Sequence, residues 1–255
     1  DVAMINVLLG VDATVDDKSD QDETALLLAV KHRHKAAAEV LLAAGALVDA
    51  CDKQGNTALL VACEMGVVDM VRLLVSAGAY AFVSNDAGQT PLIYALAKGH
   101  VDVLSVLAQV RDTHDNTALA LAAQAGDADT VKRLLAANAS VDVVNKDGKT
   151  ALQLAAENDH KAVVQVLGNV ADPDDNSAVA MAAHNGDVDL IKKLIASKAK
   201  LEKHNIDGLT PLMLAALNGH TEAARALVSA RANPRARDNE GSSAIAKAAH
   251  QGNVE

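Results

Sequence analysis

The recurrence of one short pattern constrains the fold of this chain more than any other feature of its sequence. Each copy opens with Thr or Ser, followed by Ala or Pro and then an aliphatic residue. The opening residues are Thr24, Thr57, Thr90, Thr117, Thr150, Ser177, Thr210 and Ser243, separated by 33, 33, 27, 33, 27, 33 and 33 residues. A recurrence every 20 to 50 residues is typical of repeat proteins. We therefore expect one elongated array, in which each repeat buries its apolar face on its neighbours.

Each copy has the residue types of a helical hairpin. The opening Thr or Ser can cap a first helix, and Pro91 and Pro211 occupy its first position. An aliphatic residue two positions after the opening residue and Ala five positions after it share one helix face. Gly nine positions on can end this helix in most copies, and a second apolar stripe follows, with a Leu at position seventeen. The pattern predicts two antiparallel helices per copy.

Two copies are shorter than the others by six residues. Because 33 and 27 add to 60, residues 88–147 and 148–207 read as a duplicated pair of repeats. The missing residues belong to the segment between the second helix and the next opening residue. In the longer copies this segment can form a projecting loop, which we call a finger. We expect no finger at the two short junctions, and we expect Val110 and Val170 to be buried in place of the Val of the missing segment.

The chain ends suggest partial repeats. Residues 1–18 align with the second helix and finger of a repeat, residues 19–242 hold seven repeats, and residues 243–255 begin the first helix of another. We expect the chain to be a piece of a longer array, cut within a repeat at both ends. Apolar helix faces exposed at such ends predict end-to-end self-association.

Composition and charge exclude several partners. Aromatic residues are 1 % of the chain and Trp is absent, so its helices pack through Ala, Leu and Val. The net charge is −10, with 8 basic and 17 acidic residues in 1–127 and 15 and 16 in 128–255. An acidic chain without interleaved basic and aromatic residues is a poor match for nucleic acid. We expect neither a nucleic-acid partner nor membrane insertion, because no apolar run reaches 18 residues.

The cysteines indicate the compartment. Cys51 and Cys63 are the only two, and they fall in no metal-binding spacing. Reduced cysteines are typical of intracellular proteins, so we expect an intracellular, cytoplasmic location.

The histidines do not predict a metal site. His100, His160 and His220 recur every 60 residues, which places them about 20 Å apart if helix layers pack about 10 Å apart. His32 and His34 are two residues apart, so on a helix they would point to different faces.

A run beginning at Asp172, Asp174 and Asp175 resembles the start of a calcium loop. Ser177 and Ala183 stand where such a loop needs Gly and Glu, so a turn and a helix cap are the better interpretation. The chain has no phosphate-binding loop, zinc-protease motif or nucleophile elbow. We expect no enzymatic activity, no cofactor and no metal.

The recurring T-A-L or T-P-L, then Ala, then G-H or G-D, then G-A-x-V-D resembles the ankyrin repeat over nearly the whole chain. The resemblance implies an all-α solenoid of stacked helix-turn-helix units with β-turn fingers, and a concave face of fingers and first helices. One family feature is missing, the His that often follows T-P-L. Its position holds Leu27, Leu60, Ile93, Ala120, Gln153, Ala180, Met213 and Ala246.

The resemblance also implies a function. It predicts a non-catalytic scaffold or adaptor that binds a peptide or folded protein on the concave face. The alternative is a substrate-recruiting or regulatory domain of a larger enzyme or channel. A third possibility is a purely architectural spacer.

The seventh repeat is the candidate hot spot for binding. Positions one, three and four before the opening Thr and seven and eight after it are expected to face the groove, and here three of them are aliphatic with a basic rim nearby. The candidate residues are Ile206, Leu209, Met213, Leu217, Arg235 and Arg237. They predict an acidic, partly apolar partner segment. The alternative is that Ile206 and Leu209 fold back onto neighbouring fingers.

Three further candidates lie in the N-terminal half. Met65 is a groove position of the second repeat, and Tyr80 and Phe82 lie on one side of an extended segment. The aromatic pair is either an interface anchor or packing over the adjacent junction. The acidic stretch from Val11 to Glu23 either attracts a basic partner or is a solvated loop.

Overall fold

The computed structural model describes residues 2–11, 13–170 and 176–252, and these residues form sixteen helices. Asp12 of the acidic stretch and the residues of the calcium-like run, Asp172, Asp174 and Asp175, lie outside the described ranges. The first helices of the repeats are α2 (Ala25–Lys31), α4 (Ala58–Glu64), α6 (Pro91–Lys98), α8 (Ala118–Ala125), α10 (Ala151–Glu157), α12 (Ala178–Asn185), α14 (Pro211–Leu217) and α16 (Ala244–Gln251).

The second helices alternate with them along the chain. They are α1 (Val2–Leu9), α3 (Lys35–Ala43), α5 (Val68–Ser76), α7 (Val101–Leu107), α9 (Ala128–Ala136), α11 (Lys161–Leu167), α13 (Val188–Ala196) and α15 (Thr221–Ser229). The predicted helix pairs and the all-α fold class are confirmed. Within the described ranges, extended pairing is limited to isolated bridges in the loops, between Cys51 and Thr57 and between Arg111 and Thr117.

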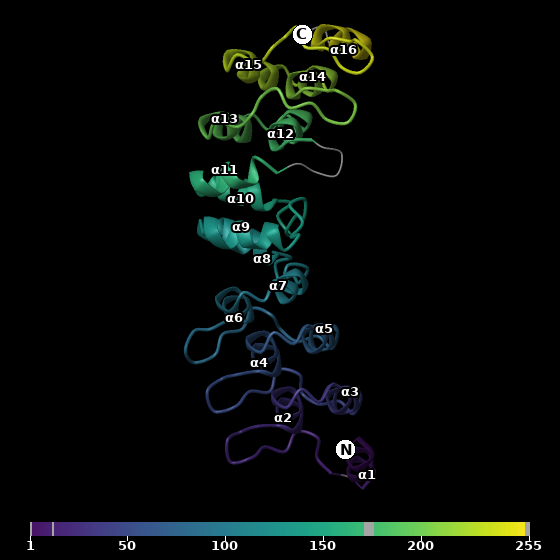
Figure 1. The fold of residues 1–255 in the computed structure, drawn as a ribbon. Helices are drawn as coiled ribbons and strands as arrows, with labels where there is room; N and C mark the ends of the chain where they lie inside the picture. Colours follow the sequence, from purple (N-terminus) through teal and green to yellow (C-terminus); the bar gives the residue numbers. More distant parts are fainter. Residues whose placement is uncertain (1, 12, 171–175, 253–255) are drawn as a thin grey trace. The chain divides into compact units, whose positions relative to one another are not determined.

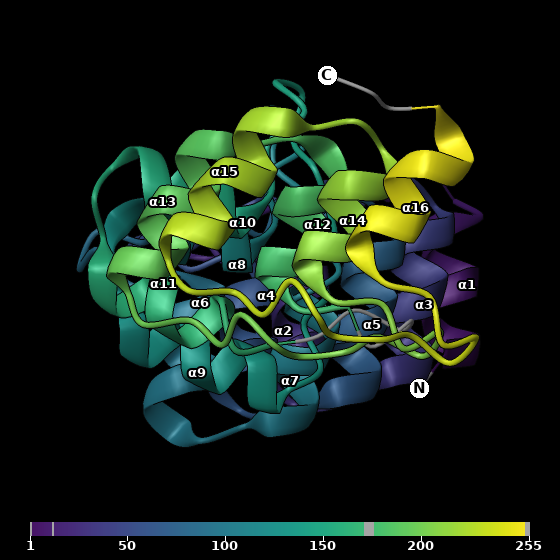
Figure 2. The same ribbon diagram turned by 90° about the horizontal axis from the view of Figure 1, so that it is seen from above.

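The helix pairs are divided between two compact units. Unit 1 comprises residues 1–118 and 133–139, and unit 2 comprises residues 119–132 and 140–255. In unit 1, α2, α4 and α6 pack in succession, and α3, α5 and α7 form the second row (Figure 1). In unit 2, α12, α14 and α16 make one row and α13 and α15 the other, as both views show (Figures 1 and 2).

The opening residues cap the first helices as predicted. Their side-chain oxygens accept the backbone N–H three residues later, at 3.3 Å for Thr24 and Thr57 and 3.2 Å for Thr90. The copies at Thr150 and Thr210 have Gln153 and Met213 at the position of the missing family His. Both side chains accept a hydrogen bond from the backbone N–H of the opening Thr. The Gln153 amide oxygen accepts the Thr150 N–H at 3.0 Å, and the Met213 sulfur accepts the Thr210 N–H at 3.5 Å.

The recurring Leu of the second helix forms the most regular part of the interior. The seven copies after α1 bury it, at Leu41, Leu74, Leu107, Leu134, Leu167, Leu194 and Leu227. The aliphatic residue near the start of the first helix is buried in most copies, including Leu26, Leu59 and Leu212. Large and small apolar side chains on facing helices fill the space between layers, as the sequence pattern predicts.

The fingers between repeats are held by a recurring Asx turn. An Asp or Asn five positions before the opening residue accepts the backbone N–H groups two and four residues later. At Asp52 these bonds come from Gln54 and Asn56, at 3.1 and 2.9 Å. The same geometry recurs at Asn85, Asp112, Asn145, Asn205 and Asp238.

The first short junction keeps the turn at the tip of the finger but lacks six residues ahead of it, so the expected loss of the finger is only partial there. Asp112 forms the Asx turn, and Arg111 and Thr117 make the same kind of bridge as Cys51 and Thr57 in a full repeat. The six missing residues belong to the linker ahead of the turn. The turn itself is held by hydrogen bonds between residues 112 and 116, so it does not need the linker. Val110 packs against the core as expected and Val170 is half-buried, but residues 171–175 of the second junction are outside the described ranges.

Candidate functional site

The candidate site is a hollow in unit 2, on the finger side of α12 and α14, which we call the finger hollow. Its volume is about 500 Å³. Its residues are Asn176, Ala180, Met181, His184, Asn185, Asn205, Ile206, Asp207, Leu209 and Leu214. Ile206 is 60 % exposed beside it, so a large aliphatic side chain stands in solvent next to a concave surface of mixed polarity.

Local geometry fixes the finger that carries Ile206. The Asn205 side-chain oxygen accepts the backbone N–H groups of Asp207 and Leu209 at 3.1 and 2.8 Å. Gly208 has a φ of +78°, and a Cβ there would lie 2.5 Å from the side-chain oxygen of Asn239. Glycine is therefore required at the tip both for its backbone conformation and for space.

Two of the predicted contact residues lie in the interior. Leu209 is 8 % exposed and Met213 is 1 % exposed, and of the two only Leu209 lines the finger hollow. The expectation that Leu209 stands in solvent on the groove is wrong. Leu217 is half-buried.

Leu209 differs from the residues at the same position in two other repeats. There, the residue before the opening Thr or Ser bonds to the Asx residue of the next finger. Asn56 accepts a hydrogen bond from Asn85 at 2.8 Å, and Asn176 accepts one from Asn205 at 3.0 Å. Leu209 holds this position in the seventh repeat, where its apolar side chain cannot make that bond and is buried at the wall of the finger hollow.

The basic rim is only partly available. Arg235 and Arg237 are exposed, and Arg237 donates to the backbone oxygen of Gly241 at 2.6 Å. His184 lines the hollow, and its Nδ1 lies 3.2 Å from the side-chain nitrogen of Asn218. The exposed parts of the predicted hot spot are therefore Ile206 and the two arginines.

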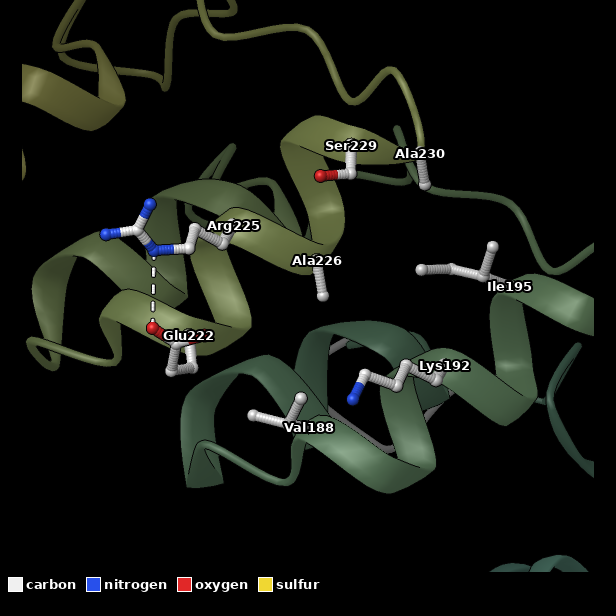
Figure 3. A pocket seen from close by; sticks show the side chains of 8 residues that line it. All are labelled: Val188, Lys192, Ile195, Glu222, Arg225, Ala226, Ser229 and Ala230. Carbon is white, nitrogen blue, oxygen red and sulfur yellow. Dashed lines mark hydrogen bonds and ion pairs between the residues drawn. The ribbon is translucent and has the colours of Figure 1, made fainter.

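A second hollow, the back cleft, lies between α13 and α15 and has a volume of about 470 Å³ (Figure 3). Val188, Lys192 and Ile195 come from α13, while Ala226 and Ala230 belong to α15 and the residue after it. Ala226 lines the cleft and stands where α5, α7 and α11 have the larger Leu73, Val106 and Val166. On one wall the Arg225 Nε donates to the Glu222 carboxylate at 3.2 Å (Figure 3).

The candidates of unit 1 differ in exposure. Tyr80 is 42 % exposed and meets the half-buried Phe82 edge-on, with ring centroids 5.9 Å apart. Phe82 and Met65 pack against the core. Packing against the core is therefore confirmed for Phe82, while the role of Tyr80 as an interface anchor stays a prediction.

Ion pairs stabilise some of the fingers. Lys31 Nζ lies 2.6 Å from Glu23 and 3.1 Å from Asp52, which joins the first repeat to the second finger. Burial disfavours the charged form of Asp52, but hydrogen bonds from Asn56 and Lys31 hold its pKa below its usual value. In the last finger, the hydrogen bond from Lys247 lowers the pKa of Asp238 in the same way.

The described residues show no constellation for metal binding. Within 2–11, 13–170 and 176–252, no group of three or more His, Cys, Asp and Glu side chains could hold an ion. Burial raises the pKa of the Cys63 thiol to about 12, which leaves it almost entirely protonated. None of the helices described by the structure has both the length and the apolar character needed to cross a bilayer.

Comparison with protein families decides the classification. A profile described as ankyrin repeats (3 copies) matches residues 1–85, 48–114, 78–144, 108–177 and 179–255. The chain belongs to the ankyrin-repeat family. Ankyrin repeats are generally protein–protein interaction modules, and the typical member is non-catalytic. A search of curated proteins found no match to this chain.

Proposed function

We propose that this ankyrin-repeat chain is a protein-binding module, a scaffold or adaptor, that holds a partner segment in the finger hollow. The observation that supports this most is the exposed Ile206 beside the hollow, next to Met181 and Leu214. A large aliphatic residue standing 60 % exposed on a finger contributes little to the fold and offers an anchor to a partner.

The chemistry of the rim suggests which segment binds. Arg235 and Arg237 are exposed on the neighbouring finger, and Asn176, Asn185 and His184 provide polar groups in the hollow. An extended segment with an aliphatic side chain at Ile206 and carboxylates toward the arginines matches this surface. We propose an acidic, partly apolar segment as the partner class.

Selection of peptides against the chain, followed by titration, tests the proposal. Ile206→Asp should weaken binding of the selected peptides at least tenfold, because truncating an apolar anchor costs about 1 to 2 kcal/mol or more and a charge adds repulsion. Ile245→Asp is the matched control, since Ile245 is 77 % exposed on α16 and does not line the hollow. Equal affinities for the two variants, with intact helical spectra, would place the binding site elsewhere.

A further inference from the structure

A second surface with the character of an interface lies in unit 1, on the linkers between second helices and fingers. Leu47 and Tyr80 occupy the same repeat position, ten residues before Thr57 and Thr90. Leu47 is 63 % exposed and Tyr80 is 42 % exposed, and Phe82 supports the Tyr80 ring edge-on. We call Leu47, Tyr80, Phe82, Asp16 and Asp49 the linker edge.

Carboxylates join the linkers of successive repeats along this edge. The Asp16 side chain accepts the backbone N–H of Leu47 at 2.9 Å, and the Asp49 side chain accepts that of Tyr80 at 3.0 Å. Each apolar residue is thereby held beside a carboxylate from the repeat before it. Asp49 stands between them, two residues after Leu47 and bonded to Tyr80.

The same bond in unit 2 shows which part of this arrangement is structural. Glu202 accepts the backbone N–H of Asn233 at 2.8 Å, at the positions equivalent to Asp49 and Tyr80. The residues equivalent to Leu47 and Tyr80 are there Lys200 and Asn233, both exposed. The fold therefore needs the acceptor and tolerates polar residues at the exposed positions, so it does not explain Leu47 and Tyr80.

The charge around the edge favours one class of partner. Among the described residues, neither Asp16 nor Asp49 has a cationic side-chain partner. Asp17 is also exposed nearby, and residues 1–127 carry 17 acidic against 8 basic groups. A cation next to Asp49 would lie close to the exposed Tyr80 ring, whose face attracts positive charge. Leu47 offers contact to an aliphatic side chain.

We propose that the linker edge docks a basic peptide segment in which Lys or Arg alternates with aliphatic residues. The cations lie at Asp16 and Asp49, and the aliphatic side chains lie on Leu47 and against Tyr80. This surface is separate from the finger hollow in residues and in the charge of its partner.

The two tyrosines of the chain make a direct test possible. Tyr80 and Tyr94 are the only tyrosines and Trp is absent, so Tyr94→Phe leaves Tyr80 as the dominant source of intrinsic fluorescence. The Tyr94 hydroxyl only adds a 3.3 Å contact to Asn85, which keeps its bond to Asn56. The probe is an end-capped octapeptide of alternating Lys and Leu. The control peptide has the same length and has Glu in place of Lys.

We expect the Lys peptide to change Tyr80 fluorescence saturably and the Glu peptide to leave it unchanged. Asp49→Asn, which keeps an oxygen acceptor for the Tyr80 N–H, should weaken binding about fivefold, and Leu47→Ser should do the same. Ile93→Ser and Asp102→Asn are the controls, at exposed positions on α6 and α7, and should bind as the parent does.

Three results would overturn the proposal. One is the absence of a saturable change with the Lys peptide while circular dichroism shows an intact fold. Another is equal binding by Leu47→Ser, Asp49→Asn and the two controls. The third is a Tyr80 signal that changes on dilution without peptide, which would make a second copy of the chain the occupant of the edge.

Discussion

The imidazole ring of His220 lies against Gly186 of the preceding repeat so closely that a Cβ at position 186 would be 2.7 Å from Nδ1. The ring's other nitrogen, Nε2, is 2.9 Å from the backbone oxygen of His184, so Nε2 carries the proton and donates. His100 and Gly66 form the same contact, as do His160 and Gly126. These glycines therefore have two roles, a left-handed backbone and a space for the next repeat.

Gly186→Ala should destabilise the chain more than Gly99→Ala. Both glycines have positive φ, 71° and 73°, so both variants incur the backbone cost of about 1 kcal/mol. Only at position 186 does the new methyl group also collide with a ring, because a Cβ at Gly99 meets nothing within 4 Å. Urea unfolding followed by circular dichroism measures the difference.

Removal of the ring should relieve the collision. In the Gly186→Ala, His220→Ala double variant we expect a loss of stability smaller than the sum of the two single losses. Strict additivity of the two losses would show that the contact carries no energy.

Substitutions at Leu209 and Ile206 should differ in their effect on stability. Leu209→Ala should lower the free energy of unfolding by about 2 to 5 kcal/mol, the usual range for a buried Leu. Ile206→Ala should change it by no more than about 0.5 kcal/mol, because that side chain is largely in solvent. Similar melting temperatures for the two variants would contradict the assignment of Leu209 to the interior.

Asp52→Asn should reduce the stability of unit 1 at neutral pH and flatten its acid dependence. The Asp52 pKa is lowered in the folded chain, so its contribution is present above its unfolded pKa of about 3.9. That contribution is lost as pH falls through the folded value. The difference between parent and variant should therefore be largest near pH 7 and shrink toward pH 2, as measured by unfolding at each pH.

The Asn substitution is informative because Asn85, Asn145 and Asn205 form the same turn in other fingers. It keeps the turn, and it removes the charge that pairs with Lys31 together with the acceptor that Oδ2 offers to Lys31 and to the Asn56 side chain. Asp86→Asn, at an exposed fingertip position, is the control and should change the free energy of unfolding at pH 7 by no more than about 0.5 kcal/mol. If the free energies of unfolding of the parent and of Asp52→Asn differ by the same amount at every pH, this ion pair has no role in the acid dependence.

Cys63 should resist alkylation in the folded chain. Its thiol is fully buried and its pKa is raised to about 12, whereas Cys51 is half-buried. Treatment with iodoacetamide at pH 8 should modify Cys51 first, with Cys63 reacting only in denaturant, as peptide mass spectrometry will show. Equal rates at the two cysteines without denaturant would contradict the buried position of Cys63.

The exposed face of α1 should promote self-association of the chain. Met4, Val7 and Leu8 are each at least half exposed there, which makes a small apolar surface. We expect sedimentation velocity to show a concentration-dependent shift that Val7→Asp reduces. Val101→Asp on α7, where Val101 is 54 % exposed, is the matched control. Sedimentation that does not depend on concentration would remove this prediction.

The local features of the fold could be predicted from the sequence because they depend on residues a few positions apart. Thr24 caps α2 by bonding Leu27, and the recurring Leu at positions such as Leu74 needs only helical spacing to be placed inside. The family could then be predicted from the residues that recur in each copy and from their period. Each of these inferences uses contacts within one repeat.

One error concerned packing between repeats, and the other concerned a local turn. Leu209 is buried at the wall of a hollow that it shares with Asn176 and Ala180 of the preceding repeat, and no pattern within one repeat shows this. The turn at Asp112 survived a deletion because its bonds to His114 and Asn116 are local, although the shortened spacing suggested a lost finger. In the finger hollow, the sequence identified Ile206 but not the lining by Met181 and Leu214.

The contact between the histidines and the glycines also bears on how such an array changes length. The three contacts recur every 60 residues. In the repeat after Gly99, the position that holds the histidine elsewhere is occupied by Asp127. Loss of residues 148–207 would bring His220 into register with Gly126 and recreate the contact. Loss of a single repeat would break the contact at most of the junctions, for example by setting Gly66 against Asp127 when residues 90–116 are lost. Relatives of this gene that differ in array length are therefore expected to differ by whole pairs of repeats, as insertions or deletions of 180 nucleotides.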